Sequence, residues 1–498
     1  MADLSPAYKP SVITRYTAQI LKLVTDIKPS EVRLSLALFA TVFFMLMAYY
    51  IGKPVRDSWL AVSAINGLSS IEVKAFSGFL QSATLITLIP FYTKLYDKLP
   101  RGKLLVYVNI FFIACFPLFW LIRPGILGAI SPYCGVAFYI WIGIFAVAVV
   151  AQFWTFAADI FDEASGKRLF PLIALGASAG AVIGSLMSKF LLETVNLNNY
   201  SLLLVAPVFL VLATFILWRV DKSEQANKAI ENKNSQEQAK KTIKPEHASM
   251  TDKRSASKII LSSRYITLIA LLIFMLNWIA TNGENILYAA IQDTIAQTDF
   301  SHLNPIETQE AVAQATAGFY SRIYFWVNLM GTLLQAFVVS RLLKYGGLTA
   351  ILMLPPVVSF ASYGAMGSIG GSNVITTAYT AENATNYSVA NTASNILWLP
   401  VSKCALYKAK AAIDTTVYRA ADAIAAMTVI MGTRFIDISL KGFFMINMFL
   451  VLIWMLVVLL ILKERKRWDG HSPIAAPPMS MMASEGMRLS AAAVETGE

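Results

Sequence analysis

Charged side chains interrupt an apolar stretch between residues 408 and 422, and they are the side chains best suited to bind a charged solute. They are Lys408, Lys410, Asp414, Arg419 and Asp422. A charge at bilayer depth costs about 2.5–3.5 kcal/mol on insertion scales, so such residues usually face a helix-bundle interior or a water-filled path. We therefore expect a solute pathway here. The alternative for Lys408 and Lys410 is a position at the membrane surface that only sets orientation.

A second charged group follows the first apolar run of the chain. Lys53 and Asp57 are four residues apart, so they share one face of a helix, and Arg56 lies beside them. Pro54 can kink this helix because it lacks a backbone donor. One interpretation is a cationic clamp at the wall of a cavity, and the other is a helix end whose cations reach toward water. Basic residues at an outer helix end are unusual, which favours the clamp.

Acids and amides also occur within or at the ends of other apolar runs. Asp159 ends one run, and Glu284 lies in another together with three asparagines. An acid inside a membrane span needs a partner and is a candidate for ligand or proton coupling. A third run is too polar to face lipid and must line water or pack between helices. Its polar residues are Thr376, Thr377, Thr380, Glu382, Asn383, Asn386, Asn391 and Asn395.

Composition places these groups in a membrane protein. Of the 498 residues, 56% are hydrophobic and 14% charged, and the mean hydropathy is +0.58. A helix needs about 20 apolar residues to cross a bilayer. We predict an all-α, major-facilitator-like protein with twelve transmembrane helices in two halves of six. The predicted spans are 34–60, 71–93, 104–123, 134–158, 170–193, 200–219, 264–290, 317–340, 347–369, 373–400, 411–435 and 440–463.

The hydrophilic segment between the sixth and seventh spans divides the chain. The predicted parts are an N-terminal segment (1–33), a six-helix half (34–219), a linker (220–263), a second half (264–463) and a disordered tail (464–498). Apolar spacing predicts an interfacial helix over 11–27, with a frayed tail as the alternative. Lys and Arg cluster in alternate loops, in the linker and after the last span, so we expect both termini in the cytoplasm.

The same features limit the function classes. The net charge of +11 reflects basic residues in short loops, so we expect no nucleic-acid partner. The three Cys and three His have no metal-ligand spacing, and we expect no metal and no cofactor. No nucleophile or phosphate-loop arrangement is visible, so we expect no catalytic residues and no enzyme. The expected partners are the lipid bilayer and a small anionic substrate, bound by a monomer. With no leader sequence apparent, a bacterial inner membrane is the expected location.

Three stretches resemble the nucleotide transporter family, the ATP:ADP antiporters of plastids and intracellular bacteria, which is related to the major facilitator fold. Gly-Lys-Pro-Val-Arg-Asp at 52–57 is similar to the family's Leu-Arg-x-x-Lys-Asp. Phe-Trp-Thr-Phe-Ala at 153–157, with Lys-Arg-Leu-Phe-Pro-Leu at 167–172, matches a second pattern at the same length. Lys-Ala-Lys-Ala-Ala-Ile-Asp at 408–414 is the most specific match.

The resemblance implies that Arg56, Lys410 and Arg419 act in transport, together with Glu284. The chain also departs from the family pattern. Lys and Arg are exchanged in the first motif, Ser165 stands where the family has an acid, and Asp422 stands where it has a lysine. Because only Arg offers a planar, bidentate fork, the exchange alters how phosphate could be bound. The chain resembles a divergent bacterial member.

These observations support nucleotide or phosphorylated-anion exchange by alternating access as the leading hypothesis. Lys53, Arg56, Lys410 and Arg419 would neutralise the anion. The supporting residues would be Asp57, Asp159, Glu284, Asn383, Asp414 and Asp422. The alternative is a proton-coupled symporter or exporter of another solute, with Glu284 or Asp422 as the proton site. A membrane scaffold is a weaker third hypothesis, because a scaffold does not need charges inside its spans.

Overall fold

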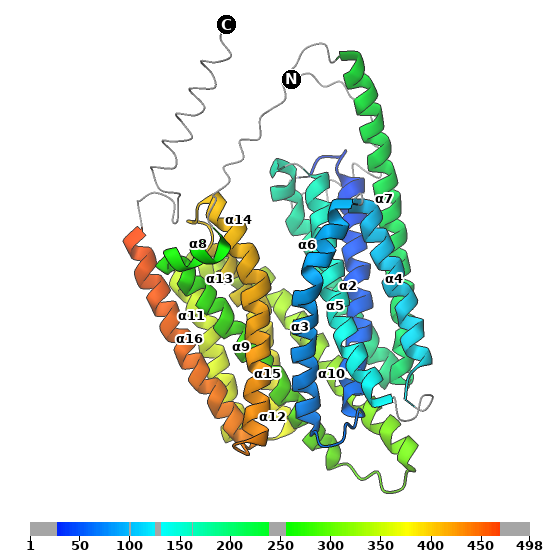
Figure 1. The fold of residues 1–498 in the computed structure, drawn as a ribbon, viewed down its shortest axis with the longest axis vertical. Helices are drawn as coiled ribbons and strands as arrows, with labels where there is room; N and C mark the ends of the chain where they lie inside the picture. Colours follow the sequence, from blue (N-terminus) through cyan, green and yellow to red (C-terminus); the bar gives the residue numbers. More distant parts are fainter. Residues whose placement is uncertain (1–26, 99–100, 125–130, 162, 239–254, 469–498) are drawn as a thin grey trace.

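The computed structural model describes residues 27–98, 101–124, 131–161, 163–238 and 255–468, and these residues form helices without strands. Two bundles stand side by side (Figure 1). The start of the first helix and the end of the last lie at the same end of the molecule, uppermost in Figure 1 and called here the upper end. The helix predicted over 11–27 falls almost entirely outside the described residues, and most of the tail does as well.

The N-terminal bundle is built from long helices that run between the two ends. Its helices are α2 (Val32–Ala61), α3 (Ser70–Lys98), α4 (Arg101–Leu121), α5 (Ser131–Ile160), α6 (Glu163–Glu193) and α7 (Leu202–Gln238). Pro54 does not break α2, which remains helical through Ala61. The helix tolerates this proline because packing against its neighbours stabilises the turn that lacks one hydrogen bond.

The C-terminal bundle contains shorter and interrupted helices. Its α-helices are α8 (Ala256–Ser262), α9 (Arg264–Ala296), α10 (Pro305–Leu333), α11 (Val339–Ser368), α12 (Ser372–Thr385), α13 (Asn391–Ile396), α14 (Lys403–Ala412), α15 (Tyr418–Arg434) and α16 (Leu440–Trp468). Three π-helical turns join consecutive helices: η3 (Leu334–Val338), η4 (Asn386–Ala390) and η5 (Ile413–Val417). Such turns often occur at functional sites.

The helices agree with twelve spans. Eight helical stretches of the described chain are long and apolar enough to cross a membrane, and one of them, Pro305–Ser368, contains two of the predicted spans. These two separate at Gly347, whose φ of 61° interrupts the helix. The three remaining spans are α3, α12 with α13, and α14 with α15. The last two pairs are less apolar than the other spans, because they carry the polar and charged residues described above.

Several helices are longer than predicted. The fifth span was expected to begin near Pro171, but α6 begins at Glu163 and keeps Pro171 inside it. The predicted linker is helical up to Gln238, and the last helix continues past 463 to Trp468. In each case a stable apolar helix extends into Lys, Glu, Gln, Ala or Arg residues. These residues propagate a helix readily once it has nucleated.

Each bundle has its own apolar core, and one close helix contact in the N-terminal bundle depends on glycine. Gly176, Gly180 and Gly184 of α6 face the backbone of α2. A Cβ at Gly176 or at Gly184 would lie 2.7 Å from a carbonyl oxygen of α2, and a Cβ at Gly180 would collide with the carbonyl of Phe43. Small residues at four-residue spacing therefore allow these two helices to approach closely.

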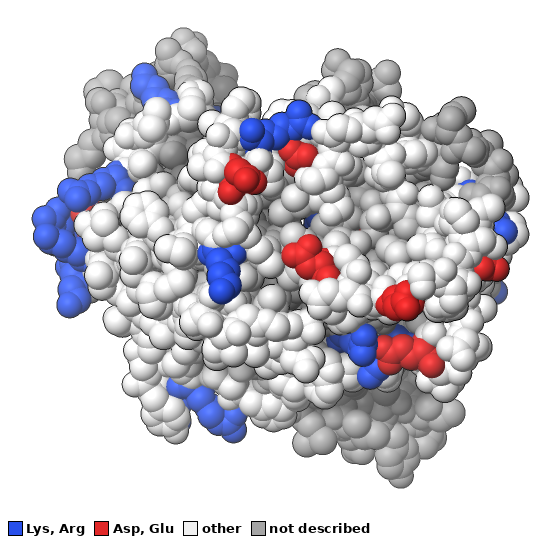
Figure 2. Space-filling model, turned by 90° about the horizontal axis from the view of Figure 1, so that it is seen from below, with Lys and Arg blue, Asp and Glu red and all other residues white. Residues whose placement is uncertain are grey.

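The two bundles contact each other at the lower end. Arg434, at the end of α15, donates to Glu72 at 2.8 Å and to the carbonyl of Gly67 at 2.6 Å. The side chain of Gln314 on α10 bonds to the backbone of the N-terminal bundle just before α7. Figure 2 shows that this end is largely uncharged, with acidic and basic groups scattered over it and a mainly basic group at its left edge. These contacts hold the lower end closed.

Candidate functional site

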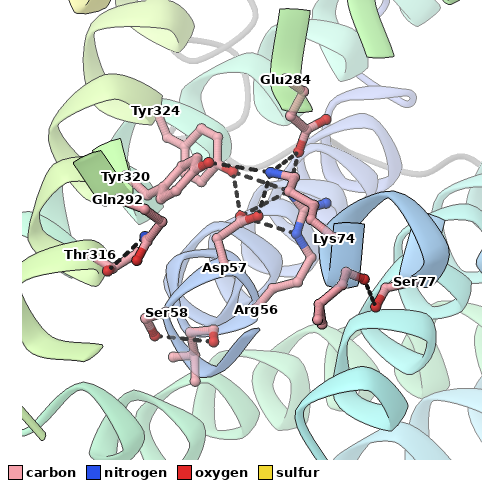
Figure 3. Close-up of polar contacts among 12 residues, drawn as sticks. Arg56, Asp57, Ser58, Lys74, Ser77, Glu284, Gln292, Thr316, Tyr320 and Tyr324 are labelled. Carbon is pink, nitrogen blue, oxygen red and sulfur yellow. Dashed lines mark hydrogen bonds and ion pairs between the residues drawn. The ribbon is translucent and has the colours of Figure 1, made fainter. Parts of the chain in front are cut away.

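A cluster of charged and phenolic side chains lies buried between the two bundles, with Asp57 at its centre. Arg56 Nη2 lies 2.9 Å from Asp57 Oδ2, and Lys74 Nζ lies 2.9 Å from Asp57 Oδ1. Arg56 also pairs with Glu284 of α9, and Lys74 Nζ is 3.7 Å from the same carboxylate. Figure 3 shows Arg56 and Lys74 converging on Asp57 and Glu284.

Two tyrosines of α10 complete the cluster. Tyr324 Oη donates to Asp57 Oδ2 at 3.0 Å, and Lys74 Nζ donates to Tyr320 Oη at 3.2 Å (Figure 3). Arg56, Asp57 and Lys74 belong to the N-terminal bundle, whereas Glu284 and the tyrosines belong to the C-terminal bundle. The cluster therefore joins the two halves.

Lys53 is the one cation of this group whose charge has no carboxylate partner among the described residues. It lies one helical turn before Asp57 and is only 8% exposed. Its Nζ is 4.1 Å from the centre of the Tyr324 ring and 5.3 Å from that of Tyr50. Aromatic rings stabilise a cation, but they leave its charge available to an anion.

The buried cluster therefore has a positive balance. Its cations are Lys53, Arg56 and Lys74, and its acids are Asp57 and Glu284, which leaves one positive charge in excess. Charges interact much more strongly in a protein interior than in water. An anion would remove this imbalance.

A cavity of about 600 Å³ reaches this cluster. Glu284, whose side chain is 30% exposed, lines it at one end. Asn395, Trp398 and Lys410 line it nearer the upper end. Its walls come from α9, from α12 to α15 and from the turns between them, and carry many amide and phenolic groups. These wall residues include Asn277, Asn383, Asn386, Asn391, Tyr379, Tyr387 and Tyr418.

Two of the three cations in the 408–422 run, Lys410 and Arg419, each pair with an acid nearby in the sequence. Lys410 Nζ lies 2.9 Å from Asp414, and both side chains line the cavity. Arg419 Nη1 lies 2.9 Å from Asp422, which also accepts a hydrogen bond from Thr281 at 2.7 Å. These pairs add hydrogen-bonding groups to the C-terminal bundle without adding net charge.

The structure brings some predicted site residues together and separates others. Lys53, Arg56, Asp57 and Glu284 share the buried cluster, while Asn383, Lys410 and Asp414 line the cavity. Asp159 is exposed at the end of α5, apart from the cluster, and Lys408 is exposed on α14. Glu284 and Asp422, the two acids considered as proton sites, both lie against cations.

Lys74 is the main residue that the sequence reasoning missed. It is 1% exposed, and its Nζ lies 2.9 Å from Asp57 Oδ1, slightly closer than Tyr324 Oη, which lies 3.0 Å from Asp57 Oδ2. It lies four residues inside a predicted span, and a lysine at such a position signals a partner in the protein interior.

The fold and the buried charges together define the class of a secondary transporter. Solved transporters are similar in structure: a D-xylose–proton symporter (TM-score 0.56, 11% identity, 85% of this chain and 97% of that one) and the nucleoside transporter NupG (TM-score 0.55, 10% identity, 86% and 98%). A POT family transporter in complex with 5-aminolevulinic acid gives a TM-score of 0.54 at 14% identity, over 86% of this chain and 95% of that one.

The sequence identifies the family within this class. The model of the TLC ATP/ADP transporter family matches residues 13–126 and 123–293, which is more than half of the chain. The chain belongs to this family, as its sequence motifs predicted. None of the curated proteins matches the sequence.

Proposed function

We propose that this transporter exchanges nucleotides of the ATP/ADP type, or related phosphorylated anions, by alternating access. The observation that carries the proposal is the excess positive charge of the buried cluster at the end of a cavity of about 600 Å³. Small-molecule sites typically measure about 300–1,000 Å³, so a nucleotide is a suitable occupant. The family membership supports the same substrate class.

The proposed binding mode places phosphate near Lys53 and Arg56. An anion that enters the cavity meets Glu284 first and competes with it for Arg56. Arg56 offers a fork suited to two phosphate oxygens, whereas Lys53 offers a point charge. Lys410 and Arg419, each beside its own acid, would contact other parts of the nucleotide. The amides and aromatic rings of the cavity wall would contact its base and sugar.

This charge balance favours exchange over one-way transport. Closing the cavity around an uncompensated cation is unfavourable at low dielectric, whereas a bound anion removes that penalty. Reorientation would therefore require a loaded site in both directions. We also propose that the upper end faces the cytoplasm of a bacterium, because the basic loops lie there. We also propose the division of the chain into five parts given above. Within it, the first part of the linker is helical up to Gln238, and the first residues of the tail are helical up to Trp468.

Replacement of Lys53 tests the binding mode. Lys53→Gln removes the cation that has no carboxylate partner in the described structure, so it leaves no buried acid unpaired. We expect ATP binding, measured by titration of the purified transporter, to weaken by roughly 10- to 100-fold, as for the loss of one charge-assisted contact. Lys189→Gln is the matched control, because Lys189 also lies over an aromatic ring (Phe325, 5.6 Å) but outside the cluster. Equal ATP affinity in both variants would contradict the role of Lys53.

A further inference from the structure

Glu382 on α12 is a buried acid that the proposed exchange mechanism does not use. It is 1% exposed, and no Lys, Arg or His of the described chain lies within ion-pair distance. Its partners are neutral: Asn386 Nδ2 at 2.6 Å, Asn383 Nδ2 at 2.9 Å and Ser359 Oγ at 3.4 Å. This environment differs from that of Asp57, Glu284, Asp414 and Asp422, which all have cations beside them.

The groups on the neighbouring helices add no compensating charge. The neighbouring Tyr379, three residues before Glu382 on α12, and Tyr363 on α11 are phenols and carry no positive charge, and Tyr363 Oη already donates to a carbonyl of α9. On α9, Glu284 is held by Arg56 and Lys74. α10 approaches this part of α12 with Gly331, close to Ala384. A carboxylate out of water and without a cation is a natural acceptor for a proton.

The amide of Asn386 suits both protonation states of Glu382. Its Nδ2 donates to the carboxylate, while its Oδ1 is buried and accepts no hydrogen bond from the described residues. A half-turn of the amide exchanges these two atoms. When Glu382 carries a proton, its hydroxyl can therefore donate to Asn386 Oδ1 in nearly the same geometry.

This network is connected to the cavity. Asn383 and Asn386 line the cavity wall, whereas Glu382 lies behind them. Asn386 is also the first residue of the π-helical turn η4, and Tyr387, the next residue, lines the same cavity. The protonation state of Glu382 can therefore change which hydrogen-bonding atoms the wall offers to a solute.

We propose that Glu382 is a proton-binding site of the transport cycle, reached from the cavity through Asn383 and Asn386. A proton passes from cavity water to a carboxylate oxygen of Glu382, and the same O–H bond breaks when the proton returns to water. Binding adds one positive charge to the C-terminal bundle and rotates the Asn386 amide. The proposal depends on the transporter class and not on the identity of the substrate.

Infrared spectroscopy of the purified transporter in lipid tests proton binding without any substrate. We expect a protonated-carboxyl band that disappears as the pH is raised, that is absent in Glu382→Gln and that remains in Glu310→Gln. Glu310 is exposed on α10, so this control removes the same group from the surface. Glu382→Asp should keep a titrating band even if the glutamine variant folds poorly. A wild-type band that persists in folded Glu382→Gln would overturn the proposal.

Transport measurements test the coupling. With ATP as the probe, we expect the uptake rate of wild type and of Glu310→Gln to vary with pH, and that of Glu382→Gln to be flat. A Glu382→Gln profile that follows the wild type would overturn coupling. Thermal stabilisation by sodium chloride over choline chloride, lost in Glu382→Gln, would indicate a metal-cation site and would also overturn the proposal. Failure of ATP transport in every variant would count against the nucleotide proposal, while the infrared result would still decide proton binding.

Discussion

Asp57 lies at the centre of the buried cluster. It accepts from Arg56 and Lys74, the two cations that also contact Glu284 of the other bundle. Its side chain is fully buried, and it accepts from Arg56, Lys74 and Tyr324. A buried ion pair adds little net stability over an apolar pair, but removing one partner leaves an uncompensated charge. The charges of this cluster should therefore depend strongly on one another.

This dependence predicts a rescue. Lys74→Met should lower the free energy of unfolding by about 3–5 kcal/mol, because Asp57 loses one of its two cations in a buried site. The double variant Asp57→Asn/Lys74→Met removes both charges and should recover a large part of that loss. Reversible unfolding in mixed detergent measures both effects. Strictly additive losses in the double variant would show that the two residues do not act as a pair.

At the residue scale, the sequence identified charges inside spans and their pairing within one helix, but not their pairing between helices. The pairs Lys410–Asp414 and Arg419–Asp422 could be predicted from the sequence, because four- and three-residue spacings place side chains on one helical face. The contact of Arg56 with Glu284 was not, since 228 positions separate them in the chain. Lys74 was not predicted because only Glu72 accompanies it in its apolar run, and a two-residue spacing does not place two side chains on one helical face.

The contact between α2 and α6 requires glycine, because the backbone of α2 lies where a Cβ on α6 would be. Gly180→Ala would place its Cβ against the carbonyl of Phe43, so the helices must separate. Overpacking of this kind costs about 1–3 kcal/mol. We expect a lower midpoint of thermal unfolding for Gly180→Ala. Gly318→Ala is the control, since nothing lies within 4 Å of a Cβ built there. Equal midpoints for the two variants would contradict the packing role.

The upper end of α2 is tied to α6 by an ion pair outside the membrane-spanning part. Arg168 Nη2 lies 3.0 Å from Glu31 Oε1, and Glu31 also accepts from the backbone N–H of Lys28 at 3.0 Å. Partial burial alone would raise the pKa of Glu31, but these bonds outweigh it and lower the pKa below its usual value. The ionised form of Glu31 is therefore favoured by folding.

This lowered pKa predicts an acid-dependent loss of stability. Because the folded-state pKa of Glu31 is the lower one, its contribution is complete above the ordinary glutamate pKa of about 4.3 and is lost as the pH falls through the folded-state value. The contribution should be about 0.5–1 kcal/mol, as both side chains are partly exposed. Thermal midpoints of wild type and Glu31→Gln should converge on acidification. A constant difference from neutral to acidic pH would contradict this account.

At the element scale, helix existence was predictable and helix ends were not. Apolar runs located the spans, because a bilayer demands about 20 apolar residues for each helix. The ends of α6, α7 and α16 lie in polar sequence, where helix propensity and not hydropathy sets the boundary. The π-helical turns had no sequence signal apart from the polar residues around them.

For the whole molecule, the contacts at the lower end hold one of the two alternating conformations. Glu72–Arg434 is a partly exposed pair between the bundles, so its loss should shift the equilibrium toward opening of the lower end by about two- to fivefold. Spin labels at the exposed positions Asn66 and Ile436 would report this change as longer distances in Arg434→Gln. Arg467→Gln is the control, because its pair with Glu464 lies within one helix. Unchanged distance distributions in Arg434→Gln would show that this pair does not hold the lower end closed.

The two-halved architecture followed from the order of apolar runs around a polar linker. The closed end did not, because it depends on contacts between residues of opposite halves, such as Glu72 and Arg434, which are 362 positions apart. The net charge of the buried cluster also could not be predicted from the sequence, because it depends on which cations and acids the fold brings together.

Uptake of labelled ATP into proteoliposomes, with and without ADP inside, tests the central claim most directly. We predict uptake only into vesicles that contain ADP, because the positive cluster must be neutralised before the cavity can close. The same uptake should be greatly reduced in Arg56→Ala. Equal uptake into empty and ADP-loaded vesicles would contradict exchange, and the absence of uptake by the folded protein in both would contradict the nucleotide as substrate.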